Sequence, residues 1–228
     1  MTAHALPAVW APGRVNLIGE HTDYSGGLVL PAAIQLGITL TVTRWADDVC
    51  LTSSGFGTAA SFAADGTGGR VEGWARYGQA VAAELAALGV RPAGFTATVD
   101  SDLPAGSGLS SSAALEVAVG LALCAVASVE LDRLELALAC QRAELRAVGV
   151  PCGILDQAAC LLGREGSALL LDCSTLEQRL VRLPAEAVML IVHSGVERSL
   201  ESSPYGERRA GAPGGDPARD HADGDAAG

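Results

Sequence analysis

The stretch LPAGSGLSSSAALEVA, residues 103–118, gives the clearest indication of the fold. The end of a β-strand, a loop of small residues and the start of a helix follow one another directly in it. The helix begins in the serine run at Ser110 and continues as AALEVAVGLALCAVA, which is apolar on nearly every side. We therefore expect this helix to be buried.

Regular elements are expected on both sides of this stretch, and together they predict mixed α+β packing. One helix is expected over residues 73–88, because Gly89 and Pro92 give it a natural end. Another helix begins near Asp132, whose side chain can cap the first turn, and ends before Gly149. Alternating, β-branched runs predict four strands, at residues 38–44, 94–99, 167–172 and 187–193.

The composition indicates a globular chain of 228 residues with no membrane segment. Its hydrophobic content of 49% comes largely from small residues, since aromatic residues make up only 4%. No apolar run reaches the roughly 18 to 20 residues that a spanning helix needs. The N-terminal residues MTAHALPAVWAPGR do not form a secretory signal, so we expect a cytoplasmic location.

The charge and the cysteines exclude further classes. A formal net charge of −11 repels a polyphosphate backbone and argues against nucleic acid as a partner. All 15 basic residues are arginine, which excludes a phosphate loop that depends on lysine. The six cysteines are scattered without a C-x-x-C pair, so we expect buried thiols rather than a zinc site or a disulfide framework.

The loop inside the opening stretch has the chemistry of a phosphate site. Gly106, Ser107 and Gly108 let the backbone approach a ligand closely, and the helix start presents unpaired N–H groups and a positive dipole end. Such a loop binds phosphate without lysine, and the hydroxyls of residues 110–112 can bind phosphate oxygens or a metal. An ordinary loop with a serine N-cap is the alternative interpretation.

A second segment, PGRVNLIGEHTDYSGG at residues 12–27, resembles neither a helix nor a strand surface. It gathers a guanidinium, two carboxylates and an imidazole, which together can select a polyhydroxylated sugar. A solvated polar loop is the alternative. The polar side chains of this segment are those of Arg14, Glu20, His21, Asp23 and Tyr24.

A third segment, AELRAVGVPCGILDQAACLLG at residues 143–163, joins the end of one helix to the start of the next. Pro151 and Gly153 set a tight turn between Glu144 and Asp156. Asp156 at a helix start can be a simple cap. Beside a phosphate loop it is also a candidate base for a hydroxyl, and Glu144 is a candidate magnesium ligand.

With these three segments the sequence resembles the galactokinases of the GHMP small-molecule kinase superfamily. GRVNLIGEHTDY resembles the galactokinase signature, PAGSGLSSSAALEVA the superfamily's ATP-binding motif, and VPCGILDQ the galactokinase catalytic segment. HSGVERSLESSPYGERR, residues 193–209, is similar to the region that carries a sugar-contacting tyrosine. The resemblance implies an N-terminal GHMP domain, a mixed sheet packed against helices.

The resemblance also implies ATP-dependent phosphorylation of galactose at its anomeric hydroxyl, giving galactose 1-phosphate and ADP. Asp156 would take the proton with Arg14 beside it, and Ser112 and Glu144 would hold Mg²⁺. The implied sugar-binding residues are Glu20, His21, Thr22, Asp23, Gly153 and Tyr205. The implied ATP-binding residues are Gly106, Ser107, Gly108, Leu109, Ser110, Ser111 and Ser112.

The resemblance ends after Arg209, before the second α+β half that galactokinases share. We therefore expect an N-terminal domain over residues 1–193, the start of a truncated C-terminal domain over 194–209, and a disordered Gly/Ala/Asp tail over 210–228. Two alternatives to the enzyme stay open, a non-catalytic sensor that binds galactose and ATP, and an inactive truncated remnant.

Overall fold

The computed structural model describes residues 6–53, 55–57, 59–104, 106–193 and 195, and its largest element is a five-stranded mixed sheet. Neighbouring strands are antiparallel except β6 and β4, which are parallel. A second sheet joins three antiparallel strands in the order β2 (Leu28–Val29), β7 (Ser167–Asp172) and β8 (Gln178–Arg182). The large sheet has the order β1 (Ala8–Asn16), β3 (Pro31–Ala46), β6 (Gly94–Ser101), β4 (Val49–Thr52), β5 (Ala60–Phe62).

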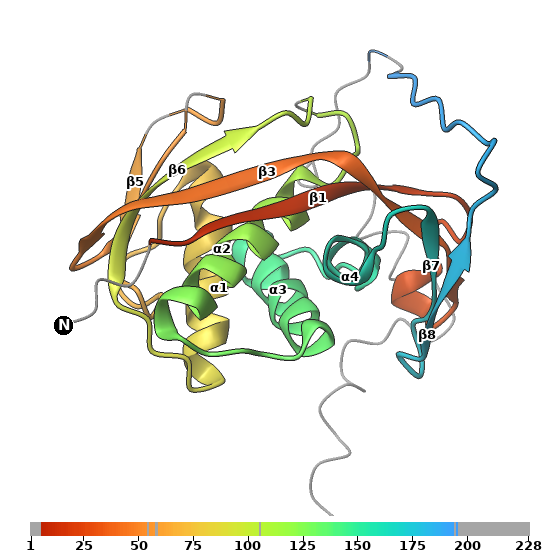
Figure 1. The fold of residues 1–228 in the computed structure, drawn as a ribbon. Helices are drawn as coiled ribbons and strands as arrows, with labels where there is room; N and C mark the ends of the chain where they lie inside the picture. Colours follow the sequence, from red (N-terminus) through yellow and green to blue (C-terminus); the bar gives the residue numbers. More distant parts are fainter. Residues whose placement is uncertain (1–5, 54, 58, 105, 194, 196–228) are drawn as a thin grey trace, which may run out of the picture.

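The helices lie on one face of the large sheet, and α4 lies beneath β1 and β3 beside the smaller sheet (Figure 1). This arrangement confirms the predicted mixed sheet packed against helices. Within the described residues, no helix has the combined length and hydrophobicity that crossing a membrane requires. The helical elements are η1 (Asp23–Ser25), η2 (Gly73–Ala75), α1 (Arg76–Ala87), α2 (Ser111–Ala127), α3 (Arg133–Val148) and α4 (Leu155–Leu162).

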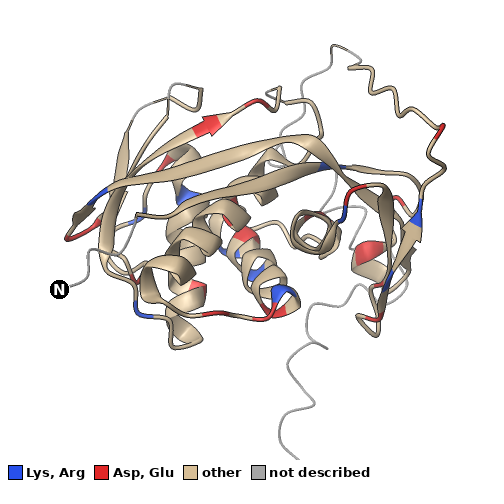
Figure 2. Cartoon of the chain, viewed as in Figure 1, with Lys and Arg blue, Asp and Glu red and all other residues tan. Residues whose placement is uncertain are grey.

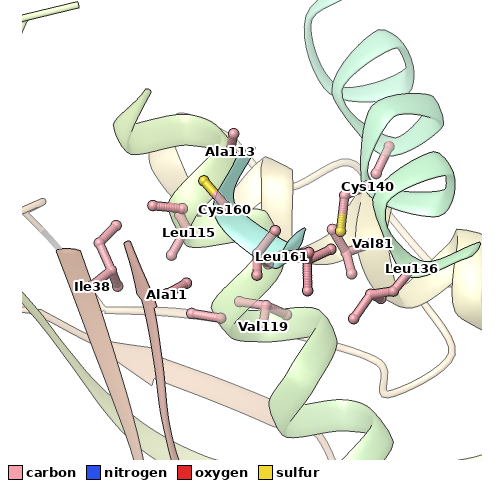
Figure 3. Close-up of a cluster of buried hydrophobic side chains, with 14 of the residues drawn as sticks. Ala11, Ile38, Val81, Ala113, Leu115, Val119, Leu136, Cys140, Cys160 and Leu161 are labelled. Atoms are coloured by element: carbon pink, nitrogen blue, oxygen red, sulfur yellow. The ribbon is translucent and has the colours of Figure 1, made fainter. Parts of the chain in front are cut away.

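The predicted burial of α2 is confirmed, because this helix forms the centre of the core. Leu115 and Val119 of α2 face Ala11 and Ile38 of the sheet, with Leu161 of α4 beside them (Figure 3). Ala113, Val117 and Ala118 are likewise fully buried. The core thus fixes the start of α2, where the candidate phosphate loop ends, against both the sheet and α4.

The predicted helix ends agree with the structure. Asp132 caps α3, since its carboxylate accepts hydrogen bonds from the backbone N–H groups of Leu134 and Glu135 at 2.8 and 3.2 Å. Gly149 ends α3 with a φ of 73°, and Gly89 follows α1 with a φ of 86°. Glycine adopts a positive φ without the steric cost that a side chain would impose, which is why it commonly ends helices.

Two expectations from the sequence are wrong. Residues 187–193 form no strand; the side chains of Val188, Leu190 and Val192 are 91, 85 and 78% exposed. A β-prone run becomes a strand only where a partner strand is present, and none lies beside it in the described part of the chain. Residues 12–16 lie in β1, because pairing with β3 overrides the local Pro and Gly.

A charged contact holds α3, which carries Glu144, against α1. Glu84 of α1 is buried and accepts hydrogen bonds from Arg142 Nε at 2.9 Å and from Arg146 Nη2 at 2.7 Å. Charged residues of both signs follow one another along α3 (Figure 2). Glu84 therefore fixes α3 from the side opposite to its buried Glu144.

We expect Glu84→Ala to lower the free energy of unfolding by about 1–2 kcal/mol, because charge-assisted hydrogen bonds are lost while the two arginines stay half-exposed to water. Urea unfolding of the parent and the variant measures the loss, which shrinks in high salt. Glu130→Ala, at an exposed position before α3, is the matched control. Equal losses in the two variants would contradict a stabilising role of the Glu84 contact.

Candidate active site

Arg14 joins β1 to two other parts of the chain. Its Nε donates to Asp156 Oδ1 at 2.6 Å, and its Nη1 donates to the Gly108 carbonyl at 2.7 Å. The backbone N–H of Arg14 donates to the Leu109 carbonyl at 3.1 Å. Gly13 permits this approach, since a Cβ there would lie 2.7 Å from the Leu109 carbonyl oxygen. Arg14 therefore links the second segment, residues 12–27, to the Gly/Ser loop and to α4.

Asp156 is held from two sides. Its Oδ1 binds Arg14, and its Oδ2 accepts a hydrogen bond from Ser110 Oγ at 2.6 Å. The N-cap of α4 is Ile154, so Asp156 does not act as the cap of this helix. Burial by itself lowers the pKa of Arg14, but the charge and hydrogen bond of Asp156 raise it above its usual value. The guanidinium therefore remains charged beside the carboxylate.

The hydroxyls of the serine run contact carboxylates. Ser110 occupies the N-cap of α2 with a φ of 59°, and its hydroxyl forms no cap hydrogen bond, since it reaches Asp156. Ser111 is the first residue of α2, and Ser112 Oγ donates to Glu144 Oε1 at 3.1 Å. Ser107 Oγ donates to the Pro104 carbonyl within its own loop. The alternative of a simple serine cap is therefore wrong for Ser110.

A cavity opens beside Asp156. Asn16 Nδ2 donates to Glu20 Oε1 at 2.9 Å, which orients that carboxylate, and His21 takes a positive φ of 63°. The cavity is lined by Arg14, Asn16, Glu20, His21, Asp23, Glu144, Cys152, Gly153, Leu155 and Asp156. The structure thus brings together the polar side chains of the second segment, residues 12–27, and the third, residues 143–163.

Asp23 and Gly153 meet in this cavity. A Cβ built on Gly153 would lie 2.0 Å from Asp23 Oδ2 and 2.6 Å from Asp23 Cβ, so only glycine leaves the aspartate in place. Burial raises the pKa of Asp23 to about 6, and the nearby charge of Asp156 adds to the shift. Asp23 is therefore held in a position that disfavours its charge until a ligand supplies hydrogen bonds.

We expect Asp23→Asn to stabilise the free chain at neutral pH. Because the folded-state pKa of Asp23 is raised above 3.8, folded protein binds the proton more tightly, and stability falls as pH rises from about 4 to about 6. The variant lacks this loss and gains up to about 2 kcal/mol above pH 6, with no gain near pH 4. Thermal melts across this pH range measure the difference.

Asp65→Asn is the control for this effect, since hydrogen bonds from Thr67 lower the pKa of Asp65 instead of raising it. A stability difference between Asp23→Asn and the parent that does not change between pH 4 and pH 7 would contradict the raised pKa.

Thr22, one of the expected sugar-binding residues, lies outside the cavity, and Tyr205 is not among the described residues. The Thr22 hydroxyl lies 2.8 and 2.9 Å from the carbonyl oxygens of Gly19 and Leu28, to which it can donate, and so supports the loop from within. Tyr205 lies outside the described residues, as do the tail at 210–228 and most of residues 194–209.

The comparisons with known proteins match the same segments. A model of the galactokinase galactose-binding signature matches residues 4–44, and a model of the GHMP kinase N-terminal domain matches residues 76–164. The chain is similar to the galactokinases of the GHMP kinase superfamily in both matched regions. The two matched regions contain Arg14 and the Gly/Ser loop, whose contact through Asp156 is described above.

Galactokinases of known sequence cover most of this chain. The galactokinase of Thermococcus kodakarensis is 44% identical over 201 residues, covering 88% of this chain and 57% of the relative. That of Chloroflexus aurantiacus is 46% identical over 204 residues, covering 88% and 52%. This chain therefore spans little more than half the length of the curated relatives it matches.

Solved structures support the family and the fold. The Lactococcus lactis galactokinase complexed with galactose superposes with a TM-score of 0.78 at 34% identity, covering 89% of this chain and 55% of that one. The mevalonate kinase of Methanococcus jannaschii gives a TM-score of 0.65 at 21% identity, which shows a shared fold.

Three buried or cavity-lining polar residues were missing from the site expected from the sequence. Asn16 lies inside the GRVNLIGEHTDY segment and could have been found there. Glu116 is the one charged residue of an otherwise apolar helix, and Gln157 follows Asp156 directly. Both are fully buried, and a buried polar residue in an apolar helix is the signal that could have found them.

Proposed function

We propose that this chain carries galactokinase activity, the ATP-dependent transfer of a phosphoryl group to the anomeric hydroxyl of D-galactose, with galactose 1-phosphate and ADP as products. The observation that carries the proposal is the position of Asp156, which accepts hydrogen bonds from Arg14 of the galactose signature and from Ser110 of the Gly/Ser loop. One carboxylate thus borders both candidate binding sites.

In the proposed reaction galactose occupies the cavity beside Asp156. Glu20, His21 and Asp23 bind its hydroxyl groups, and the absence of a side chain at Gly153 leaves the Asp23 carboxylate in place. Asp156 accepts the proton of the anomeric hydroxyl while that oxygen attacks the γ-phosphorus. Arg14 binds the Asp156 carboxylate and opposes the negative charge that develops on the transferred group.

The Gly/Ser loop would bind the ATP phosphates. Positive φ angles of 64° at Gly106 and 73° at Gly108 bend the loop before α2, whose N-terminus presents free N–H groups. Phosphoryl transfer passes through a loose transition state, so placing the two substrates and stabilising charge supply most of the acceleration.

The Ser112 hydroxyl and the Glu144 carboxylate fit a magnesium site. Both are hard oxygen donors, and Mg²⁺ needs few protein ligands because phosphate and water complete its shell. Among the described residues, no group of three or more His, Cys, Asp or Glu is arranged to bind a metal. A bound Mg²⁺ would neutralise charge on the ATP phosphates.

We also propose a cytoplasmic location, where ATP is available.

The test is ADP release by the purified 228-residue chain with Mg²⁺ and ATP, in the presence of galactose or of 1-deoxygalactose. We expect ADP release with galactose but not with 1-deoxygalactose, because 1-deoxygalactose lacks the accepting hydroxyl. Phosphorus NMR should then detect galactose 1-phosphate. Equal release with the two sugars would indicate ATP hydrolysis rather than transfer. No release from a folded sample that binds galactose would favour the sensor, and no binding would favour the remnant.

A further inference from the structure

Glu144 is bound from three elements at once. Ser112 of α2 donates to its Oε1, while Gln157 Nε2 of α4 and Cys152 Sγ of the preceding turn donate to its Oε2, at 2.8 and 3.1 Å. The side chain is buried, with 3% of the residue exposed. The direction of this carboxylate is therefore set by its neighbours rather than by water.

Gln157 connects Glu144 to a second buried carboxyl group. Its Nε2 donates to Glu116 Oε2 at 3.0 Å as well as to Glu144 Oε2 at 2.8 Å, which uses both hydrogens of the amide. Glu116 and Gln157 are both 0% exposed. Glu116 lies four residues after Ser112, so the same face of α2 carries both groups.

The buried pair of Glu116 and Gln157 lowers the stability of the fold. Within the described part of the chain, Glu116 Oε1 and Gln157 Oε1 are buried without a hydrogen-bond partner. Buried polar atoms of this kind destabilise a fold, and apolar side chains of similar volume often do better. The polar pair therefore suggests a task besides packing, and the one carboxylate it touches outside itself is Glu144.

We propose that Gln157 is a positioning residue for the magnesium ligand Glu144, and that Glu116 holds the Gln157 amide in place. Gln157 holds Glu144 Oε2 by a hydrogen bond, which would leave Oε1, beside Ser112, as the oxygen to bind the metal. The inference rests on the proposed function, because it takes Glu144 as the metal ligand. Asp156 and Gln157 are consecutive on α4. This helix therefore carries both the proposed base and the residue that orients Glu144 of α3.

The experiment measures the affinity of the full 228-residue chain for ADP by calorimetry, with and without Mg²⁺. The dissociation constant for ADP without Mg²⁺, divided by that with Mg²⁺, reports how much the metal strengthens ADP binding. We expect Gln157→Leu to lower this ratio about 10-fold or more, the usual effect of removing a group that orients a metal ligand, with metal-free ADP affinity unchanged. Glu116→Leu lowers it similarly, whereas Glu116→Gln, which can still accept from Gln157, retains it.

Gln79→Leu is the matched control, because it also removes a glutamine that donates a hydrogen bond, to the Gly69 carbonyl at a distance from the site. If Glu144→Gln lowers the ratio and Gln157→Leu does not, the positioning role is wrong and the metal site stands. If Glu144→Gln has no effect, or Mg²⁺ does not strengthen ADP binding to the parent, the proposed metal site is wrong and the positioning role with it.

Discussion

Asp156→Asn removes galactose phosphorylation and leaves galactose binding largely intact. Asparagine has the same size and can still accept a hydrogen bond through its Oδ1 from Arg14 or Ser110, so the cavity wall keeps its shape. It cannot take the proton of the anomeric hydroxyl. A positioned general base contributes about 10²- to 10⁴-fold to rate, and we expect kcat to fall by that factor.

The measurement for Asp156→Asn combines steady-state kinetics with galactose calorimetry. Circular dichroism melts show whether the loss of the negative charge beside Arg14 destabilises the fold, so that lost activity is not mistaken for lost structure. Asp132→Asn is the control, because asparagine caps a helix as well as aspartate does. Turnover in Asp156→Asn within a few-fold of the parent would remove Asp156 from the role of base.

Gly153→Ala abolishes galactose binding at ordinary sugar concentrations. The new Cβ would occupy the space of the Asp23 carboxylate, so Asp23 must rotate out of the cavity. A hydrogen bond to a charged group contributes about 1.5–3 kcal/mol, and its loss weakens galactose binding by roughly 10- to 100-fold. The fold tolerates the change, because Asp23 follows a surface loop and can move into water.

Calorimetry with galactose measures the effect of Gly153→Ala, and Gly69→Ala is its control, since a Cβ at Gly69 would meet nothing within 4 Å. The double variant Gly153→Ala/Asp23→Ala gives a sharper test. If Gly153→Ala acts by displacing Asp23, the double variant binds galactose no more weakly than Asp23→Ala alone. Additive losses would place the effect of Gly153 elsewhere.

The sequence predicted those elements whose ends are marked by local chemistry. Asp132 and Gly149 bracket α3, and the apolar run after Ser110 predicted the buried α2, because caps and periodicity act within one turn of the chain. β1 escaped prediction because its Pro12 and Gly13 break the strand pattern, and only pairing with β3 fixes it. Residues 187–193 show the reverse case, in which local propensity is present but no described strand lies beside them.

The candidate site was predicted in its members and not in its contacts. The motifs named Arg14, Ser110 and Asp156, yet nothing in their spacing shows that the Ser110 hydroxyl reaches a carboxylate 46 positions away. Thr22 stands in the sugar motif and still turns its hydroxyl to its own loop. Side-chain direction depends on packing between distant elements, which one sequence read along the chain does not contain.

The cavity divides into a loop side and a helix side, and this division affects how such a protein can diverge. Asn16, Glu20 and Asp23 come from the end of β1 and the exposed turn after it, where substitution costs little stability. Glu144 and Leu155 come from helices packed into the core, where substitution disturbs packing. Under the proposed function, substitutions on the loop side can therefore change which acceptor is bound while the helix side is retained.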